Sequence, residues 1–261
     1  MSTFWAGILK CWNRYGNSYL IGARNTLIIS LVGTIIGCVI GFAVGIVQTI
    51  PVSKSDGLPK RVLLKIANAV LRIYVDVFRG TPMIVQAVFI YYGARMAFSI
   101  SMDMWTAAFF IVSINTGAYM AETVRGGILS IDPGQTEGAK AIGMTHLQTM
   151  VAVILPQAFR NIIPQIGNNF IINIKDTSVL SVISISDLFF MHKGVVGALY
   201  LYFESATIVM VIYLTMTLIA SKLLRLLEKR MDGDDSYDLA TTDTLAHTSG
   251  MHSFRGKRGG K

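Results

Sequence analysis

Residues 132–164 read DPGQTEGAKAIGMTHLQTMVAVILPQAFRNIIP, and this segment is the most informative part of the chain. Its first half is polar, yet strongly apolar segments lie on both sides of it. Asp132, Pro133 and Gln135 have the order of an N-cap, a first-turn proline and a capping-box partner, which predicts the start of a helix. We expect this helix to end at Gly143, because glycine readily adopts the left-handed conformation found at helix C-termini.

A second short helix is expected directly after the first. Thr145 and Gln148 form another capping-box pattern, and we expect Pro156 to limit the helix because proline interrupts a helix interior. Two short helices joined at a glycine and placed outside the bilayer would make a rigid projection. On a membrane protein, such a projection is suited to binding by a partner protein.

The composition indicates an integral membrane protein. Of the 261 residues, 52% are hydrophobic and 15% are charged, and the mean hydropathy is +0.54, which does not fit a soluble domain. The net charge of +8 is explained by basic loops on the cytoplasmic side. With no basic helix or aromatic platform in the sequence, we expect no nucleic-acid partner.

Apolar segments of about 20 residues predict an all-α fold with about five transmembrane helices. Three of these are regular: residues 25–53, 104–121 and 205–221. The second in chain order, residues 80–94, reaches full length only with residues 66–79, and Gly80 and Pro82 predict a change of direction inside it. The fourth, residues 161–190, is interrupted by Lys175 and Asp176.

Lysine and arginine near the ends of the spans predict the orientation. Five of them lie on one side: Lys10, Arg14, Arg24, Arg95 and Lys193. Twelve lie on the other side: Lys54, Lys60, Arg61, Lys65, Arg72, Arg125, Lys140, Arg160, Lys222, Arg225, Lys229 and Arg230. The more basic side is expected in the cytoplasm, which places the two short helices and the C-terminus inside and the N-terminus outside.

The two ends of the chain differ from its middle. Residues 1–24 are expected to form a short helix in the outer membrane interface, held there by four amphipathic rings: Trp5, Trp12, Tyr15 and Tyr19. Residues 231–261 are poor in apolar side chains and are expected to be a disordered cytoplasmic tail. The transmembrane domain would then span residues 25–230.

Several spaced motifs resemble one family of membrane proteins. EGAKAIG at 137–143, followed after nine residues by VILP at 153–156, resembles the EAA loop of ABC-importer permeases, with Gly138 and Val153 as departures from the usual alanine and isoleucine. Four other segments are similar to the polar-amino-acid branch of that family: FRGTP at 78–82, GAYMAETVRGGILSIDPGQ at 117–135, ILPQAFRNIIPQIGNNFI at 154–171 and KDTSVLSVISISDLF at 175–189. The resemblance extends over about residues 24–230.

The resemblance implies a type I importer permease in the cell membrane of a prokaryote. Its permease domain would carry a cytoplasmic coupling loop at about residues 123–164. The implied partners are a cytoplasmic ATP-binding subunit, a second permease subunit of the same or a related sequence, and an extracytoplasmic amino-acid-binding protein, besides membrane lipid. The residues implied to couple to the ATPase are Glu137, Gly138, Ala139, Gly143, Leu155 and Pro156.

The sequence lacks the GxxxxGK[ST] pattern that cradles nucleotide phosphates. ATP is therefore expected to bind to a partner, and the chain is expected to be no enzyme and to hold no cofactor, metal or catalytic residue. An ion-coupled secondary transporter is the alternative function. It would show repeats or paired broken helices, whereas one span here is broken by charges.

Ionisable groups at membrane depth are costly and indicate a transport route. Lys175 and Asp176 are the main charged candidates, with an ion pair as the structural alternative. The other candidates for the route are polar groups of the third and fourth spans: Asn115, Thr116, Glu122, Asn169 and Asn173. Asp76, Arg79, Gly80 and Pro82 are assigned a structural or gating role in preference to substrate contact, with Arg79 paired to Asp76 one turn earlier.

Four glycines recur every fourth residue along the first span: Gly33, Gly37, Gly41 and Gly45. Such a ridge lets a second helix approach closely. We expect packing within the same chain in preference to a seam between subunits.

Overall fold

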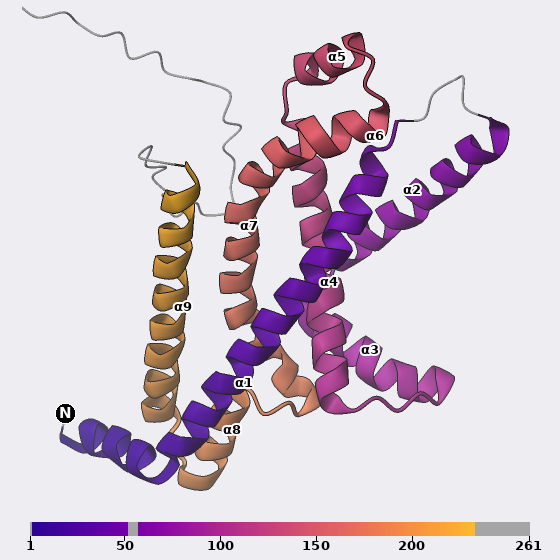
Figure 1. The fold of residues 1–261 in the computed structure, drawn as a ribbon. Coiled ribbons are helices and arrows are strands. Elements are labelled where there is room, and N and C mark those ends of the chain that lie inside the picture. Colours follow the sequence, from indigo (N-terminus) through magenta and orange to yellow (C-terminus); the bar gives the residue numbers. More distant parts are fainter. Residues whose placement is uncertain (1, 52–56, 233–261) are drawn as a thin grey trace, which may run out of the picture.

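The computed structural model describes residues 2–51 and 57–232, and all regular structure in these ranges is helical (Figure 1). Three long helices form the frame: α1 (Ser2–Thr49), α4 (Met104–Leu129) and α9 (Tyr202–Asp232). α1 runs diagonally across the molecule and lies against α4 (Figure 1). The prediction of an all-α fold is confirmed.

The close packing of α1 on α4 follows from the glycine ridge. A Cβ atom at Gly33 would lie 2.4 Å from a methyl carbon of Val112, and one at Gly41 would lie 2.3 Å from the Cβ of Met120. Gly37 and Gly45 face α4 in the same way. The glycine ridge therefore packs against α4 of the same chain, as expected, and does not form an interface between subunits.

The second predicted span is bent. α2 (Leu58–Gly80) and α3 (Met83–Phe98) meet at an angle of 113° across Thr81 and Pro82. Pro82 precedes the first residue of α3 with φ −63°, so it serves as the N-cap of the second half. The predicted change of direction is confirmed.

The fourth predicted span is also interrupted where its charges lie. α7 (Leu155–Asp176) passes into a 3₁₀ segment, η2 (Thr177–Ile183), and then into α8 (Leu188–Leu199) after a bend of 52°. Asp187, which is fully buried, caps α8 by accepting hydrogen bonds from the backbone N–H groups of Phe189 (3.1 Å) and Phe190 (2.9 Å).

Length and apolar composition identify two single helices of the described chain that can cross a membrane, α1 and α9, and the two bent pairs raise the number to four. α4 is not among them, and it carries polar groups from its middle onward, such as Asn115, Thr116 and Glu122. It is nevertheless 26 residues long, and half of its residues are buried among the other helices. The predicted number of about five spans therefore includes α4 as the central one.

The N-terminal segment differs from its prediction. Residues 2–24 do not form a separate short helix but the first part of α1, which bends away from the rest (Figure 1). Tyr19 is not an interface ring: it is fully buried and its hydroxyl lies 2.6 Å from the Oγ of Ser205 on α9. Trp5 and Trp12, by contrast, are exposed.

The loops gather at two ends of the molecule. The short helix α5 (Pro133–Ala141), the C-terminal end of α1 and the C-terminal end of α9 point to one end, whereas the N-terminus and α8 lie at the other (Figure 1). This arrangement agrees with the prediction that the loops lie on two opposite sides of the membrane. The prediction that the side with α5 faces the cytoplasm stays a prediction. The predicted tail, apart from Met231 and Asp232 at the end of α9, lies outside the described residues, as does Lys54.

Candidate coupling helices and transport route

The projecting segment begins as the sequence predicts. Asp132 caps α5 by accepting a hydrogen bond from the N–H of Gly134 (2.7 Å), and Pro133 occupies the first turn. The predicted capping box is wrong, however. The side chain of Gln135 does not return to Asp132 but accepts a hydrogen bond from Gln157 on α7 (3.4 Å). This contact joins the projection to the helix that follows it.

The end of α5 is a glycine-dependent stop. Gly143 has φ +84°, which only glycine adopts without strain. The N–H of Met144 bonds to the carbonyl of Ala139 (3.1 Å), and that of Gly143 bonds to the carbonyl of Lys140 (3.0 Å). This pair of hydrogen bonds is the Schellman motif, and it sets the turn between the two short helices.

The prediction for the second short helix is confirmed at its start and is wrong at its end. α6 (His146–Thr149) begins with the predicted capping box of Thr145 and Gln148. Pro156 does not end it: the chain continues through a π-helical segment, η1 (Met150–Ile154), directly into α7. Pro156 has no N–H to donate, and the widened turn before it lets Leu155 bond to the carbonyl of Met150 instead. Helices α6, η1 and α7 are therefore one continuous rod.

Most of the predicted coupling residues are on the surface of this projection. Glu137, Gly138, Gly143 and Pro156 are exposed, and nothing else in the described chain lies within 4 Å of a Cβ placed at Gly138 or Gly143. Ala139 is instead buried at 6% exposure and belongs to the base of the projection.

Three large apolar side chains on the projection were not predicted. Ile142, Leu147 and Val151 are 79%, 72% and 58% exposed, and they line a shallow hollow together with Gly143 and Met144. The sequence signal that would have found them is the spacing of 147 and 151, which places these two side chains on the same face of a helix.

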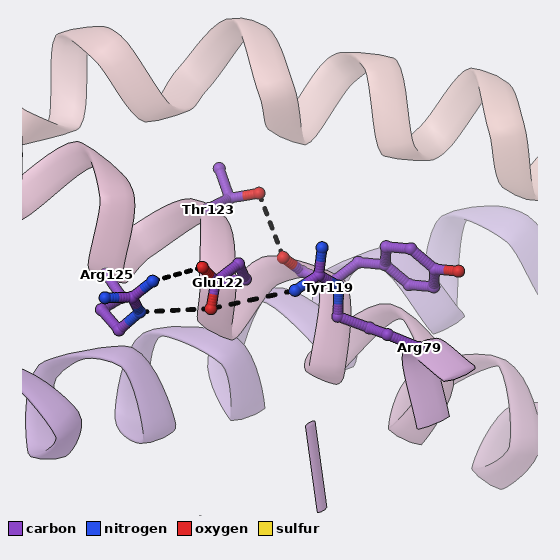
Figure 2. A network of polar contacts seen from close by, with 5 residues as sticks. All are labelled: Arg79, Tyr119, Glu122, Thr123 and Arg125. Atoms are coloured by element: carbon purple, nitrogen blue, oxygen red, sulfur yellow. Dashed lines mark hydrogen bonds and ion pairs between the residues drawn. The ribbon is translucent and has the colours of Figure 1, made fainter. Parts of the chain in front are cut away.

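A cluster of charges lies where the bend between α2 and α3 meets α4. Figure 2 shows Glu122 of α4 between two arginines. Arg125 donates to it through two nitrogens, with Nε 3.2 Å from Oε2, whereas Nη1 of Arg79 lies 3.9 Å from Oε2. The guanidinium of Arg79 also lies over the ring of Tyr119, 5.7 Å from its centroid. The expected pairing of Arg79 with Asp76 is wrong, because α2 packs against α4 and Arg79 meets Glu122 there.

The corner itself is fixed by Gln86, which the sequence did not single out. Its Nε2 donates to the carbonyls of Phe78 and Thr81, both at 2.9 Å, and its Oε1 accepts from Asn115 at 2.9 Å. Asn115 is buried, and its Nδ2 donates to Oε1 of Gln86 and to the carbonyl of Phe78. It ties α4 to the corner.

Thr116 and Asn173 form a second buried tie. The amide nitrogen of Asn173 donates to the hydroxyls of Thr34 (2.8 Å) and Thr116 (2.9 Å), so α1, α4 and α7 meet at one polar point. Thr34 and Thr116 are 4% and 2% exposed. These residues hold the helices together, and a route lined by them would have to pass through the packed interior.

The remaining route candidates are closer to the surface. Asn169 is half-buried and bonds to the carbonyl of Gln165 (2.9 Å) within α7. Asp176 is half-buried, and Lys175 is exposed and lines a groove with His192, Tyr202 and other residues of α8 and α9. Neither Lys175 nor Asp176 has an ion pair within 4.0 Å in the described part of the chain.

Residues 57–233 match the sequence model of a protein family described as "binding-protein-dependent transport system inner membrane component". The chain belongs to this family of permeases. The match begins at α2 and includes the bent pair, α4, the projection and α9.

Two relatives show which branch of the family this permease resembles. It is 40% identical over 211 residues to the glutamine transport system permease protein of Escherichia coli (strain K12), covering 80% of this chain and 91% of that one. It is also 40% identical over 169 residues to the L-cystine transport system permease protein of Bacillus subtilis (strain 168), covering 62% of this chain and 70% of the relative. The predicted family, an amino-acid ABC importer permease, is thereby confirmed.

A solved structure agrees with the fold of this permease. An amino acid ABC transporter crystallised with histidines has a chain that is 37% identical, with a TM-score of 0.74, covering 83% of this chain and 95% of its own. The type I importer permease fold predicted from the motifs is confirmed, and the chain is a membrane protein.

Within the described residues of this permease, no group of three or more histidine, cysteine, aspartate or glutamate side chains could hold a metal ion.

Proposed function

We propose that this chain is the transmembrane subunit of an ATP-driven importer for polar amino acids. It would receive the amino acid from an extracytoplasmic binding protein and release it into the cytoplasm by alternating access. A separate ATP-binding subunit would bind on the projection of α5 and α6, and a second permease subunit would complete the route. The N-terminus would lie outside and the C-terminus inside.

The observation that carries this proposal is the projection itself. It combines an exposed acidic residue, Glu137, with exposed glycine backbone at Gly138 and Gly143 and with the apolar side chains of Ile142 and Leu147. Water solvates such an apolar group poorly, and a protein cleft that covers it gains hydrophobic free energy. Small residues allow the partner's backbone to approach closely.

The projection is also rigidly connected to the membrane part. Ala139 is buried at its base, the side chain of Gln135 meets Gln157, and Asn161 of α7 donates to Ser130 at the end of α4 (3.2 Å). Because α6 continues through η1 into α7, a displacement of the projection would be passed to a helix of 22 further residues, about 33 Å long, which contains Pro164 in its interior. That rod ends at Asp176, where the helix geometry changes.

Alternating access needs two conformations with different affinity for the ATP-bound and empty states of the partner. The bends at Thr81 and Pro82 and at η2 are the places where backbone angles can change while the packed helices stay intact. Substrate choice would be made chiefly by the soluble binding protein. L-Glutamine is the first amino acid to test because a relative named for glutamine transport is 40% identical.

The test is uptake into proteoliposomes that contain the permease, its ATP-binding subunit and the binding protein. We expect L-glutamine or another polar amino acid to accumulate only with ATP on the ATPase side. Uptake that follows a proton or sodium gradient without ATP would instead support the ion-coupled secondary transporter.

The binding site of the ATPase is tested separately by cross-linking. A cysteine introduced at position 141 or 138 of α5, both exposed, should cross-link to the ATP-binding subunit, whereas one at position 93 of α3 should not. Cross-links from position 141 to lipid alone would contradict the coupling role of the projection.

A further inference from the structure

The charge cluster at the bend of α2 and α3 is not electrically balanced. Two guanidinium groups, of Arg79 and Arg125, face one carboxylate, that of Glu122. One positive charge is therefore left without a partner in the cluster. Asp76, the nearest acid along α2, makes no ion pair within 4.0 Å in the described residues.

The two arginines are not bound equally. Arg125 engages both oxygens of Glu122 through Nε and Nη2, which is the strong bidentate arrangement. Arg79 approaches the same carboxylate only to 3.9 Å, beyond the length of a hydrogen bond. Its guanidinium therefore keeps donors for which the structure gives no hydrogen-bond acceptor among residues 2–51 and 57–232.

The cluster is accessible. The side chains of Arg79, Glu122 and Arg125 are 42%, 35% and 38% exposed in this chain. Glu122 and Arg125 directly follow the apolar residues 104–121 of the third span, so the cluster lies at one end of that span. Charged groups at such a depth face water or protein in preference to lipid tails, and a transport route would open to water at this end.

The position of Arg79 is fixed although its side chain is accessible. Phe78, the residue before it, accepts hydrogen bonds through its carbonyl from Gln86 (2.9 Å) and from Asn115 (3.3 Å). The ring of Tyr119 lies beside Arg79, with its centroid 5.7 Å from the guanidinium carbon. The spacing of Asn115, Tyr119 and Glu122 places all three on one face of α4.

We propose that Arg79 binds the α-carboxylate of the amino acid during its passage, and that Glu122 is the internal anion that occupies Arg79 between passages. This proposal rests on the proposed function and names a residue that contacts the substrate. A guanidinium binds a carboxylate through two parallel hydrogen bonds. The incoming carboxylate would neutralise the surplus charge, and Glu122 would remain paired with Arg125 when Arg79 leaves it.

The test measures binding to the purified complex of the permease with its ATP-binding subunit, in the absence of the binding protein. Isothermal titration with L-glutamine is compared with titration with L-glutaminamide, which lacks the carboxylate. A charge-assisted hydrogen bond contributes enough for a preference of about tenfold or more for L-glutamine. If the proteoliposomes accumulate a different amino acid, that amino acid and its α-amide replace this pair. Equal binding of the accumulated amino acid and its α-amide, or no binding of either, would overturn the proposal.

Three variants separate substrate contact from a structural ion pair. Arg79→Gln should abolish the preference for L-glutamine, and Arg72→Gln, an exposed position on the same helix, should keep it. Glu122→Gln should bind L-glutamine more tightly than the wild-type complex, because the competing anion is gone. If the cluster is only structural, Arg79→Gln and Glu122→Gln will weaken binding alike, and the proposal is wrong.

The two proposals fail in different ways. ATP-driven uptake by the wild-type proteoliposomes, together with equal binding of L-glutamine and L-glutaminamide, would leave the importer function intact and remove the role of Arg79. A lack of ATP-driven uptake of any amino acid would instead contradict the proposed function itself.

Discussion

Gly143 shows how a single residue shapes the surface of the projection. Its φ of +84° lies in the left-handed region, which costs an L-residue with a side chain about 1 kcal/mol or more. Any other residue there would strain the turn between α5 and α6 and alter the direction of the exposed face. The glycine of the EAA-like motif is thus required by backbone geometry.

We predict that Gly143→Ala lowers ATP-driven uptake at least several-fold and reduces co-purification of the ATP-binding subunit, while insertion into the membrane is unchanged. The matched control is Gly126→Ala, which lies inside α4, outside the projection, with φ below zero and free space around its Cβ position. The control variant should keep both the ATP-driven uptake and the co-purification of the ATP-binding subunit. Full co-purification with Gly143→Ala would count against the role of this turn.

Gly41 is required for a different reason, the distance between two helices. An added Cβ would lie 2.3 Å from the Cβ of Met120, so α1 and α4 would have to move apart. We predict that Gly41→Ala destabilises the purified permease by about 1–3 kcal/mol, as overpacking does, visible as a lower midpoint of thermal unfolding in detergent. Gly93→Ala on α3, where the nearest atom is 4.0 Å away, is the control and should leave the midpoint unchanged.

At the scale of the elements, buried polar ties hold the helices in register. Asn173 joins α7 to α1 and α4 through two hydroxyl groups, and Gln86 joins α3 to the corner of α2 and to α4. Hydrogen bonds between helices in a membrane contribute about 1–2 kcal/mol in model peptides and less in some proteins. Their main consequence is that each helix has one defined partner group.

We predict that Asn173→Leu lowers the thermal midpoint of the purified permease, because it leaves the hydroxyls of Thr34 and Thr116 without their buried partner. Asn168→Leu changes the same residue type on the same helix at an exposed position and is expected to have little effect. A midpoint for Asn173→Leu equal to that of Asn168→Leu would show that the tie contributes nothing measurable.

The π-helical segment η1 is an element that local patterns did not predict. Pro156 suggested the end of a helix, since proline interrupts regular hydrogen bonding. Pro156 lacks an N–H group, and the chain accommodates it with one wider, π-helical turn and continues as α7. The continuity matters for function, because it makes the projection and the fourth span one mechanical part.

At the scale of the whole molecule, the ends of the helices gather at two opposite ends of the molecule. The projection lies at the end where α1 and α9 finish (Figure 1). We predict that removal of residues 233–261 leaves ATP-driven uptake near the wild-type value. The apolar content of this segment is low, so it offers little to a packed interface. A large loss of uptake by a truncated chain that still inserts and binds the ATPase would reveal a function for the tail.

Much of this architecture is already present in the order of the residues. Asp132, Thr145 and Gly143 mark helix ends through rules that act over three or four residues, and apolar windows indicate the spans. The glycine repeat indicates close packing, and Gly80 with Pro82 indicates a bend. These features follow from backbone sterics, capping and hydropathy, which depend on near neighbours and need no knowledge of the fold.

The partners of the polar side chains could not be derived in this way. Arg79 was expected to pair with Asp76 but meets Glu122, 43 positions later, and Tyr19 is buried on Ser205 rather than placed in an interface. Asn115 and Thr116 looked like groups lining a route, yet packing buries them as ties between helices. Which group a side chain meets depends on how distant helices cross, and that is set by the packing of all of them together.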